Sequence, residues 1–130
     1  GEYTIRIDCD VLQADGGTRT AAITGGCVAL ADACGWLAAR TGRPSAFGSL
    51  VAAVSVGMLE GEVLLDLAYA EDKDAGVDAN VVMRSPDAFV EVQGTGEHGT
   101  FSRSQLDAIV DSAHRGIASL FDIQRKALGW

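Results

Sequence analysis

Residues 13–20, Gln-Ala-Asp-Gly-Gly-Thr-Arg-Thr, combine the residue types that bind a phosphate group. They follow an alternating apolar run and precede a long apolar run with helical spacing. The first amide groups of a helix have no partners within it, and the helix dipole makes that end positive. Gly16 and Gly17 would let the backbone approach an anion, and Arg19 offers a planar fork for two phosphate oxygens. The segment predicts an anion site, with a plain helix start as the alternative.

A second candidate is the acidic segment 71–78, in which Asp72, Asp74 and Asp78 are clustered. Carboxylate oxygens suit Mg²⁺ or Mn²⁺, and such an ion can neutralise phosphoryl charge. A bare cluster of this kind is more often a solvated loop. Asp78 is the exception, because it borders the apolar run 80–83, and a carboxylate entering a buried strand is costly unless it is paired or bound to metal.

The histidines and cysteines point to no further chemistry. His98 and His114 have no evident partner, so we expect them to be bystanders. Cys9, Cys27 and Cys34 have neither a CxxC pair nor a metal-binding spacing. They occupy apolar positions, and we expect small, buried, reduced thiols.

The elements that must position these groups follow from the hydrophobic pattern. We expect a half-buried strand over residues 4–12, and a helix over 18–40 that is apolar nearly all round and therefore buried against several neighbours. Four strands should follow, at residues 51–58, 62–69, 80–84 and 88–93, with turns at 60–61 and 85–87. Ser102 and Gln105 form a capping box that starts a last helix. The order β-α-β-β-β-β-α describes an α+β chain.

Composition limits the class of protein. The 130 residues make one domain at most, or part of one, and 48% hydrophobic residues are ample for a core. A net charge of −8 argues against a broad electrostatic grip on nucleic acid, so an RNA ligand would need a local basic site or charge from another chain. We see no apolar run of membrane-spanning length and no signal peptide, and we expect a cytoplasmic protein without a membrane partner.

Taken together, these segments resemble the bacterial ribonuclease PH family over nearly the whole chain. The matching runs are 7–25, 51–57, 65–67 with Tyr69, 71–72, 77–78 with 80–83, 89–95, and 101–103 through 124–128. The resemblance implies a ribonuclease PH-like fold, of the ribosomal protein S5 domain 2-like type. Residues 1–130 would then be the C-terminal half of a single domain, and the N-terminal half is absent from this chain.

The resemblance also implies a reaction. Enzymes of this family degrade RNA from its 3′ end by phosphorolysis: inorganic phosphate attacks the last phosphodiester and releases a nucleoside diphosphate, usually from the 3′ trailer of a tRNA precursor. Gly17, Thr18 and Arg19 would bind the phosphate. Asp72 and Asp78 would hold Mg²⁺ or Mn²⁺, or act as acid toward the leaving 3′ oxygen, and their division of roles stays open. Arg19, Asp72 and Asp78 would be the catalytic residues.

The resemblance finally implies partners: RNA, a complementary N-terminal half chain, and a homo-oligomeric ring, a hexamer built as a trimer of dimers. The alternative is an inactive RNA-binding or structural subunit of such a ring. A subunit of that kind would be expected to lose the arginine or the aspartates. Arg19, Asp72 and Asp78 are all present, which favours catalysis.

Overall fold

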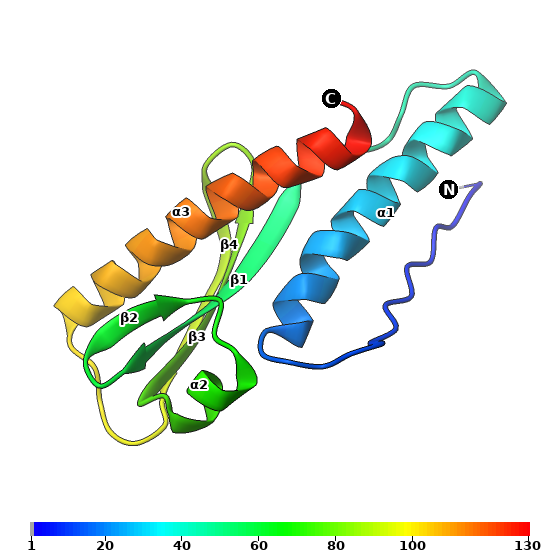
Figure 1. Ribbon diagram of the computed structural model, residues 1–130. Helices are drawn as coiled ribbons and strands as arrows, with labels where there is room; N and C mark the ends of the chain where they lie inside the picture. The colour runs from blue at the N-terminus through cyan, green and yellow to red at the C-terminus, as the bar shows by residue number, and fades with distance from the viewer. Residues whose placement is uncertain (1) are drawn as a thin grey trace.

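The computed structural model describes residues 2–130 and has one four-stranded antiparallel sheet with three helices (Figure 1). Along the chain the elements are α1 (Thr18–Thr41), β1 (Val51–Leu59), β2 (Glu62–Leu65), α2 (Tyr69–Asp74), β3 (Val77–Arg84), β4 (Ala88–Gly96) and α3 (Arg103–Leu128). The strand order in the sheet is β2-β1-β3-β4. The predicted α+β class and the four later strands are confirmed, but the strand predicted over residues 62–69 ends at Leu65 and Tyr69 begins α2. Asp66 breaks the strand there, because its φ of 59° lies outside the β region.

The hydrophobic core lies between α3 and one face of the sheet. Alternate residues of β1 and β3 meet the apolar stripe of α3, and this buried cluster contains Ala52, Val54, Val56, Met58, Val77, Ala79, Val81, Met83, Ile109, Ala113, Ile117 and Phe121. Successive side chains of a strand point to opposite faces, so the remaining residues of these strands face away from α3. We call that opposite face, which carries Ser55, Asp78, Asn80, Glu91 and Gln93, the site face.

Helix side chains complete the hydrogen bonds of β1 where β2 ends. β2 pairs only with the second half of β1, which leaves one edge of the first half without a strand partner. The amide of Ala53 donates to Thr24 Oγ1 at 3.0 Å, and the same hydroxyl donates to the Ala53 carbonyl at 3.2 Å. The Val51 amide donates to Cys27 Sγ at 3.1 Å, and Gln124 Nε2 donates to the Val51 carbonyl at 2.9 Å. These contacts fix α1 against the sheet edge.

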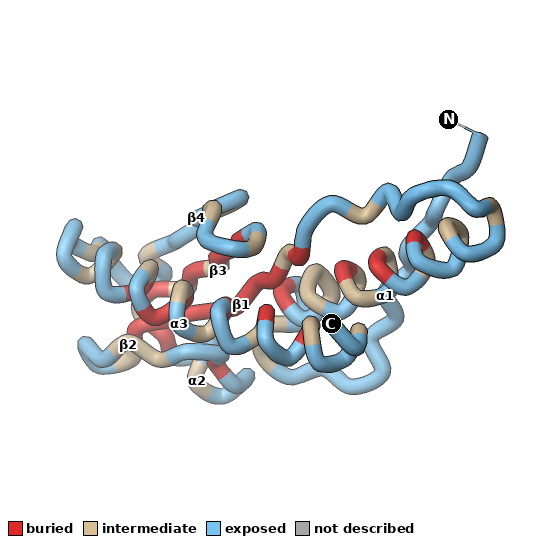
Figure 2. The backbone as a smooth tube through the Cα atoms, turned by 90° about the horizontal axis from the view of Figure 1, so that it is seen from above, coloured by how far each residue is buried: buried red, intermediate tan, exposed pale blue. Residues whose placement is uncertain are grey.

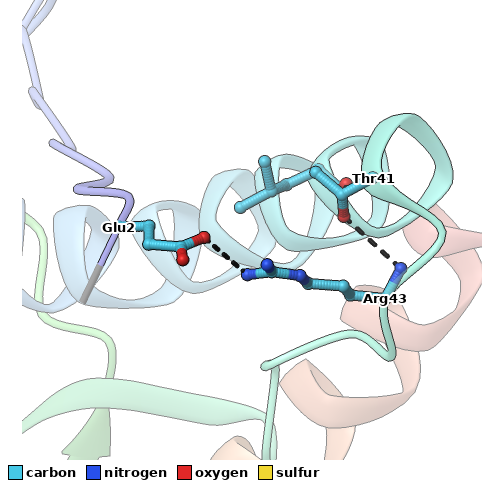
Figure 3. A network of polar contacts seen from close by, with 4 residues as sticks. Glu2, Thr41 and Arg43 are labelled. Carbon is cyan, nitrogen blue, oxygen red and sulfur yellow. Dashed lines mark hydrogen bonds and ion pairs between the residues drawn. The ribbon is translucent and has the colours of Figure 1, made fainter.

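The strand predicted at residues 4–12 is not formed. This segment is exposed and runs beside α1 (Figure 1), where Cys9 Sγ donates to the Ala22 carbonyl at 3.7 Å. Its start is tied to the far end of the helix by Arg43 Nη1 and Glu2 Oε2, 2.8 Å apart (Figure 3). A strand needs a second strand to pair its backbone groups, and within residues 2–130 none lies beside this segment. Cys9 is therefore exposed, contrary to expectation, whereas Cys27 and Cys34 are buried as predicted.

α1 spans the predicted residues but is much less covered than expected. Its buried residues are only Thr20, Cys27, Ala31 and Cys34, and Trp36 is 64% exposed. Figure 2 shows α1 as mostly exposed and intermediate, with a few short buried stretches. The predicted burial on several sides is thus wrong for this chain alone, because the described elements reach only part of the helix. By length and composition α1 could also cross a membrane, contrary to our reading of the sequence, but the core helix of a soluble protein has the same properties.

The acidic segment is not a loop throughout. Its first half belongs to the short helix α2, where the Ala68 amide donates to Glu71 Oε2 at 2.9 Å. β3 then begins at Val77, earlier than predicted, and so includes Asp78. The two predicted turn and cap signals are confirmed. Glu60 and Gly61 have φ angles of 52° and 88°, as a tight hairpin turn requires, and the capping box at Ser102 starts α3.

Candidate functional site

The predicted phosphate segment forms the N-terminus of α1. Gly17 is the N-cap residue in the left-handed region (φ 69°, ψ 25°), and no side chain caps the helix. A Cβ at Gly16 would lie only 1.7 Å from the Leu67 carbonyl oxygen, so a larger residue would displace the turn. The helix therefore presents its first-turn amides, including those of Thr18 and Arg19, without a capping side chain, as an anion site requires.

Asp15 fixes this turn to α2, a role that the sequence analysis missed. Its Oδ1 accepts hydrogen bonds from the amides of Gly16 at 2.9 Å and Tyr69 at 2.6 Å. These bonds lower the pKa of the Asp15 carboxyl, and the bond from Tyr69 has the larger effect. The Asp-Gly pair is a local signal for the first bond, because Asp side chains commonly bond to nearby backbone amides in turns. The second bond joins the phosphate segment to the helix that carries Asp72.

Arg19 crosses the site face to an acidic partner on β4. Its Nη2 donates to Glu91 Oε2 at 2.9 Å, and the two side chains are 52% and 38% exposed. The hydrogen bond from Arg19 lowers the pKa of the Glu91 carboxyl. The contact spans 72 positions of the sequence, so no local pattern could have predicted it.

The acidic residues gather around Asp78 at the beginning of β3. Asp72 from α2, Asp78 from β3 and the neighbouring Glu97 and His98 line one surface pocket. Burial raises the pKa of the Asp78 carboxyl, and the negative charges of Asp72 and Glu97 raise it further. The structure therefore brings the two predicted aspartates together. It adds Glu97, which the sequence analysis did not single out.

The carboxylates of this pocket suit a metal ion that has few protein ligands better than one that is coordinated by protein groups alone. Within residues 2–130, no group of three or more His, Cys, Asp or Glu side chains is arranged to hold a metal. Mg²⁺ usually retains several waters and is bound through one or two carboxylates together with substrate phosphates. Asp72 and Asp78 match that donor set, since the negative charge of Asp72 helps to raise the pKa of Asp78 and a bound cation would offset that charge.

The strand register puts the arginine contact and the acidic pocket on the same face. Glu91 is the Cα partner of Val82, and Thr95 that of Asp78. Val82 and Asp78 lie four residues apart on β3, which corresponds to roughly 13 Å along one face. The contact between Arg19 and Glu91 is thus separated from Asp78 by roughly 13 Å along this face.

A row of polar residues occupies this space. Ser55, Asn80 and Gln93 are Cα partners across β1, β3 and β4. The Ser55 hydroxyl is buried and has no hydrogen-bond partner among the described residues. It lies 3.2 Å from the position that a Cβ on Gly17 would take, beside the start of α1. A buried hydroxyl without a partner is costly, so a hydrogen-bonding group of a ligand would be favourable at this end of the row.

His114 makes a structural contact and lies outside the candidate site. His114 Nε2 lies 2.7 Å from Asp87 Oδ1, so it has a partner after all, and the contact joins α3 to the turn between β3 and β4. α3 packs on the face opposite the site. His98 lines the acidic pocket but makes no contact that assigns it a role.

Comparison with known proteins gives consistent matches. The 3′ exoribonuclease family, domain 2, matches residues 49–116, and domain 1 of the same family matches residues 1–34. A protein of Frankia casuarinae named Ribonuclease PH is 59% identical over 128 residues, which cover 98% of this chain and 50% of that protein. One of Nocardia farcinica, also named Ribonuclease PH, is 57% identical over 130 residues, 98% of this chain and 51% of the relative. The chain spans about half the length of these curated relatives.

The fold is also found among solved structures. Rice (Oryza sativa) Rrp46 superposes with a TM-score of 0.66 at 24% sequence identity. The match covers 89% of this chain and 50% of the other. At this identity the similarity concerns the arrangement of the elements alone.

Proposed function

The chain belongs to the 3′ exoribonuclease family, and on that premise we propose that it is the C-terminal half of a phosphorolytic exoribonuclease. Inorganic phosphate would attack the last phosphodiester of an RNA and release a nucleoside diphosphate. The proposed substrate is the 3′ trailer of a tRNA precursor. One observation carries the proposal: the uncapped start of α1, with Arg19, shares a sheet face with the paired carboxylates Asp72 and Asp78.

The phosphate would bind at the start of α1. Gly17 would allow close approach, the amides of Thr18 and Arg19 would donate to the anion, and the guanidinium would add charged donors. The bond to Glu91 uses one of the five guanidinium N–H groups. Holding the attacking anion in line with the phosphodiester is the principal task of a catalyst for phosphoryl transfer.

The carboxylates would act on the other reactant. We propose that Asp72 and Asp78 hold Mg²⁺ or Mn²⁺, which when bound supplies charge that offsets that of the attacked phosphodiester. In the alternative assignment Asp78 does not ligate the ion but gives a proton to the leaving 3′ oxygen, a role that its raised pKa favours.

RNA binding and assembly need more than this chain provides. Its net charge of −8 opposes a polyanion, and α1 leaves much apolar surface exposed. We propose that a complementary N-terminal half covers α1 and supplies the basic groups that contact RNA. The complete domain would work in the cytoplasm as a hexameric ring, a trimer of dimers.

A phosphorolysis assay tests this proposal. The chain is assembled with the N-terminal half of a ribonuclease PH relative and incubated with a tRNA precursor, with and without inorganic phosphate. We expect nucleoside diphosphates only when phosphate is present. Arg19→Ala should lower kcat/KM for phosphate by roughly a hundredfold or more, the usual effect of losing a group that stabilises developing charge.

The products also distinguish the alternatives. Release of nucleoside monophosphates without phosphate would contradict phosphorolysis. An assembled protein that binds the precursor but leaves it intact would instead be a structural or RNA-binding subunit. Unchanged kinetics in Arg19→Ala would remove Arg19 from the site.

A further inference from the structure

A β-bulge in the edge strand β4 sets the direction of Glu91. Val82 pairs with Glu91, but the next residue, Met83, pairs with Phe89, so Val90 is an extra residue in β4. In a regular strand Phe89 and Glu91, two positions apart, would share a face. With the extra residue, Phe89 lies opposite Met83 on the α3 side, and Glu91 is turned to the site face. Bulges are common beside active sites, where they redirect a side chain.

The redirected carboxylate meets the residue proposed to bind phosphate. Arg19 lies in the first turn of α1, and a long side chain there has many rotamers when nothing fixes it. Glu91 accepts one N–H of its guanidinium at 2.9 Å, from a strand held in the sheet by the ladder to β3. The remaining N–H groups of the fork are then presented in one orientation.

Stability alone is a weak reason for this pair. Both side chains are well exposed to solvent, and exposed ion pairs contribute little to folding. A bulge that aligns one partner therefore needs another explanation. We infer that Glu91 is a positioning residue, which holds the Arg19 guanidinium in the orientation that receives inorganic phosphate. This inference rests on the proposed phosphate site and adds a residue to it.

Competition between Glu91 and phosphate for Arg19 is the opposite effect, and it predicts the reverse result. A carboxylate resembles phosphate as a ligand for arginine, so Glu91 could compete with it. Competition predicts tighter phosphate binding when Glu91 is removed, whereas positioning predicts weaker binding. The sign of the change decides between them.

Phosphate titration of this chain provides the test. Amide resonances of Thr18 and Thr20 are followed by NMR as inorganic phosphate is added. Glu91→Ala should raise the dissociation constant about threefold to tenfold, because a misplaced binding group loses much of its effect. Glu91→Gln keeps an acceptor oxygen and should recover part of the loss. Asp107→Ala, which removes the 2.8 Å ion pair with Arg103 on α3, is the matched control and should change nothing.

A double variant separates positioning from a general structural effect. In an Arg19→Ala background, Glu91→Ala should have no further effect on phosphate binding, since positioning acts only through the guanidinium. Equal losses in both backgrounds, no change, or tighter binding in Glu91→Ala would each overturn the inference while leaving the phosphate site in place. A wild-type chain whose amides do not respond to phosphate would overturn the phosphate site itself, and this inference with it.

Discussion

At the scale of residues, the site combines one carboxylate that is hard to ionise with others that are held in place. The pKa of Asp78 is raised chiefly by burial, and less by the charges of Asp72 and Glu97. Backbone hydrogen bonds lower the pKa of Asp15. Asp15 therefore stabilises its turn as an anion, and that contribution is lost only as the pH falls below its ordinary pKa of about 3.9. Asp78 does the reverse, because its ionised form is disfavoured in the folded chain. Such an unfavourable charge is typical of a site that binds a cation or transfers a proton.

Replacing Asp78 by Asn should make the folded chain more stable at neutral pH. A folded-state pKa above the ordinary value gives stability that is complete below about pH 4 and is lost as the pH rises through the raised pKa. Asp78→Asn removes this loss, so its urea midpoint should exceed that of the wild type at pH 7 and match it at low pH. Asp74→Asn, at an exposed position of α2, serves as the control and should show no such gain. A lower midpoint for Asp78→Asn at pH 7 would show that the charge is already compensated.

At the scale of elements, α1 depends on a few polar contacts with the edge of β1 that has no strand partner. Thr24 supplies both an acceptor and a donor to Ala53, which is only 3% exposed. Gln124 of α3 donates to the carbonyls of both Thr24 and Val51, at 2.9 Å each, and so joins the two helices to the strand. The orientation of the phosphate segment, at the start of α1, follows from this edge contact.

Removing the Thr24 hydroxyl should weaken that contact. Thr24→Val keeps the shape of the side chain but leaves the buried amide of Ala53 without its partner, which costs about 1–3 kcal/mol of unfolding free energy. Thr24→Ser retains the hydroxyl and should recover most of this loss. Urea unfolding of the three proteins measures the difference. If Thr24→Val is as stable as the wild type, α1 is held by other contacts.

At the scale of the whole molecule, the parts that could be predicted are those with local signals. The capping box of α3, the hairpin at Glu60 and the phosphate turn each depend on residues close in sequence. The strand at 4–12 failed because strand formation needs a partner, and no neighbouring strand within residues 2–130 pairs with it. Glu91 was missed because the bulge and the contact with Arg19 depend on long-range pairing. Local patterns thus singled out the residues of the candidate site, and the tertiary structure brings them to one face of the sheet.

The incomplete covering of α1 gives the last prediction. Trp36 is 64% exposed on a helix whose composition suits a core, so a complementary N-terminal half should bury it. In a Trp130→Phe background, where Trp36 is the one remaining tryptophan of the two, adding that half should shift the fluorescence to shorter wavelength and slow amide exchange along α1. Sedimentation should show a stable complex, and association of the chain with itself when the half is omitted. If the chain sediments as a monodisperse monomer and the emission wavelength of Trp36 does not change when the half is added, α1 is a true surface helix.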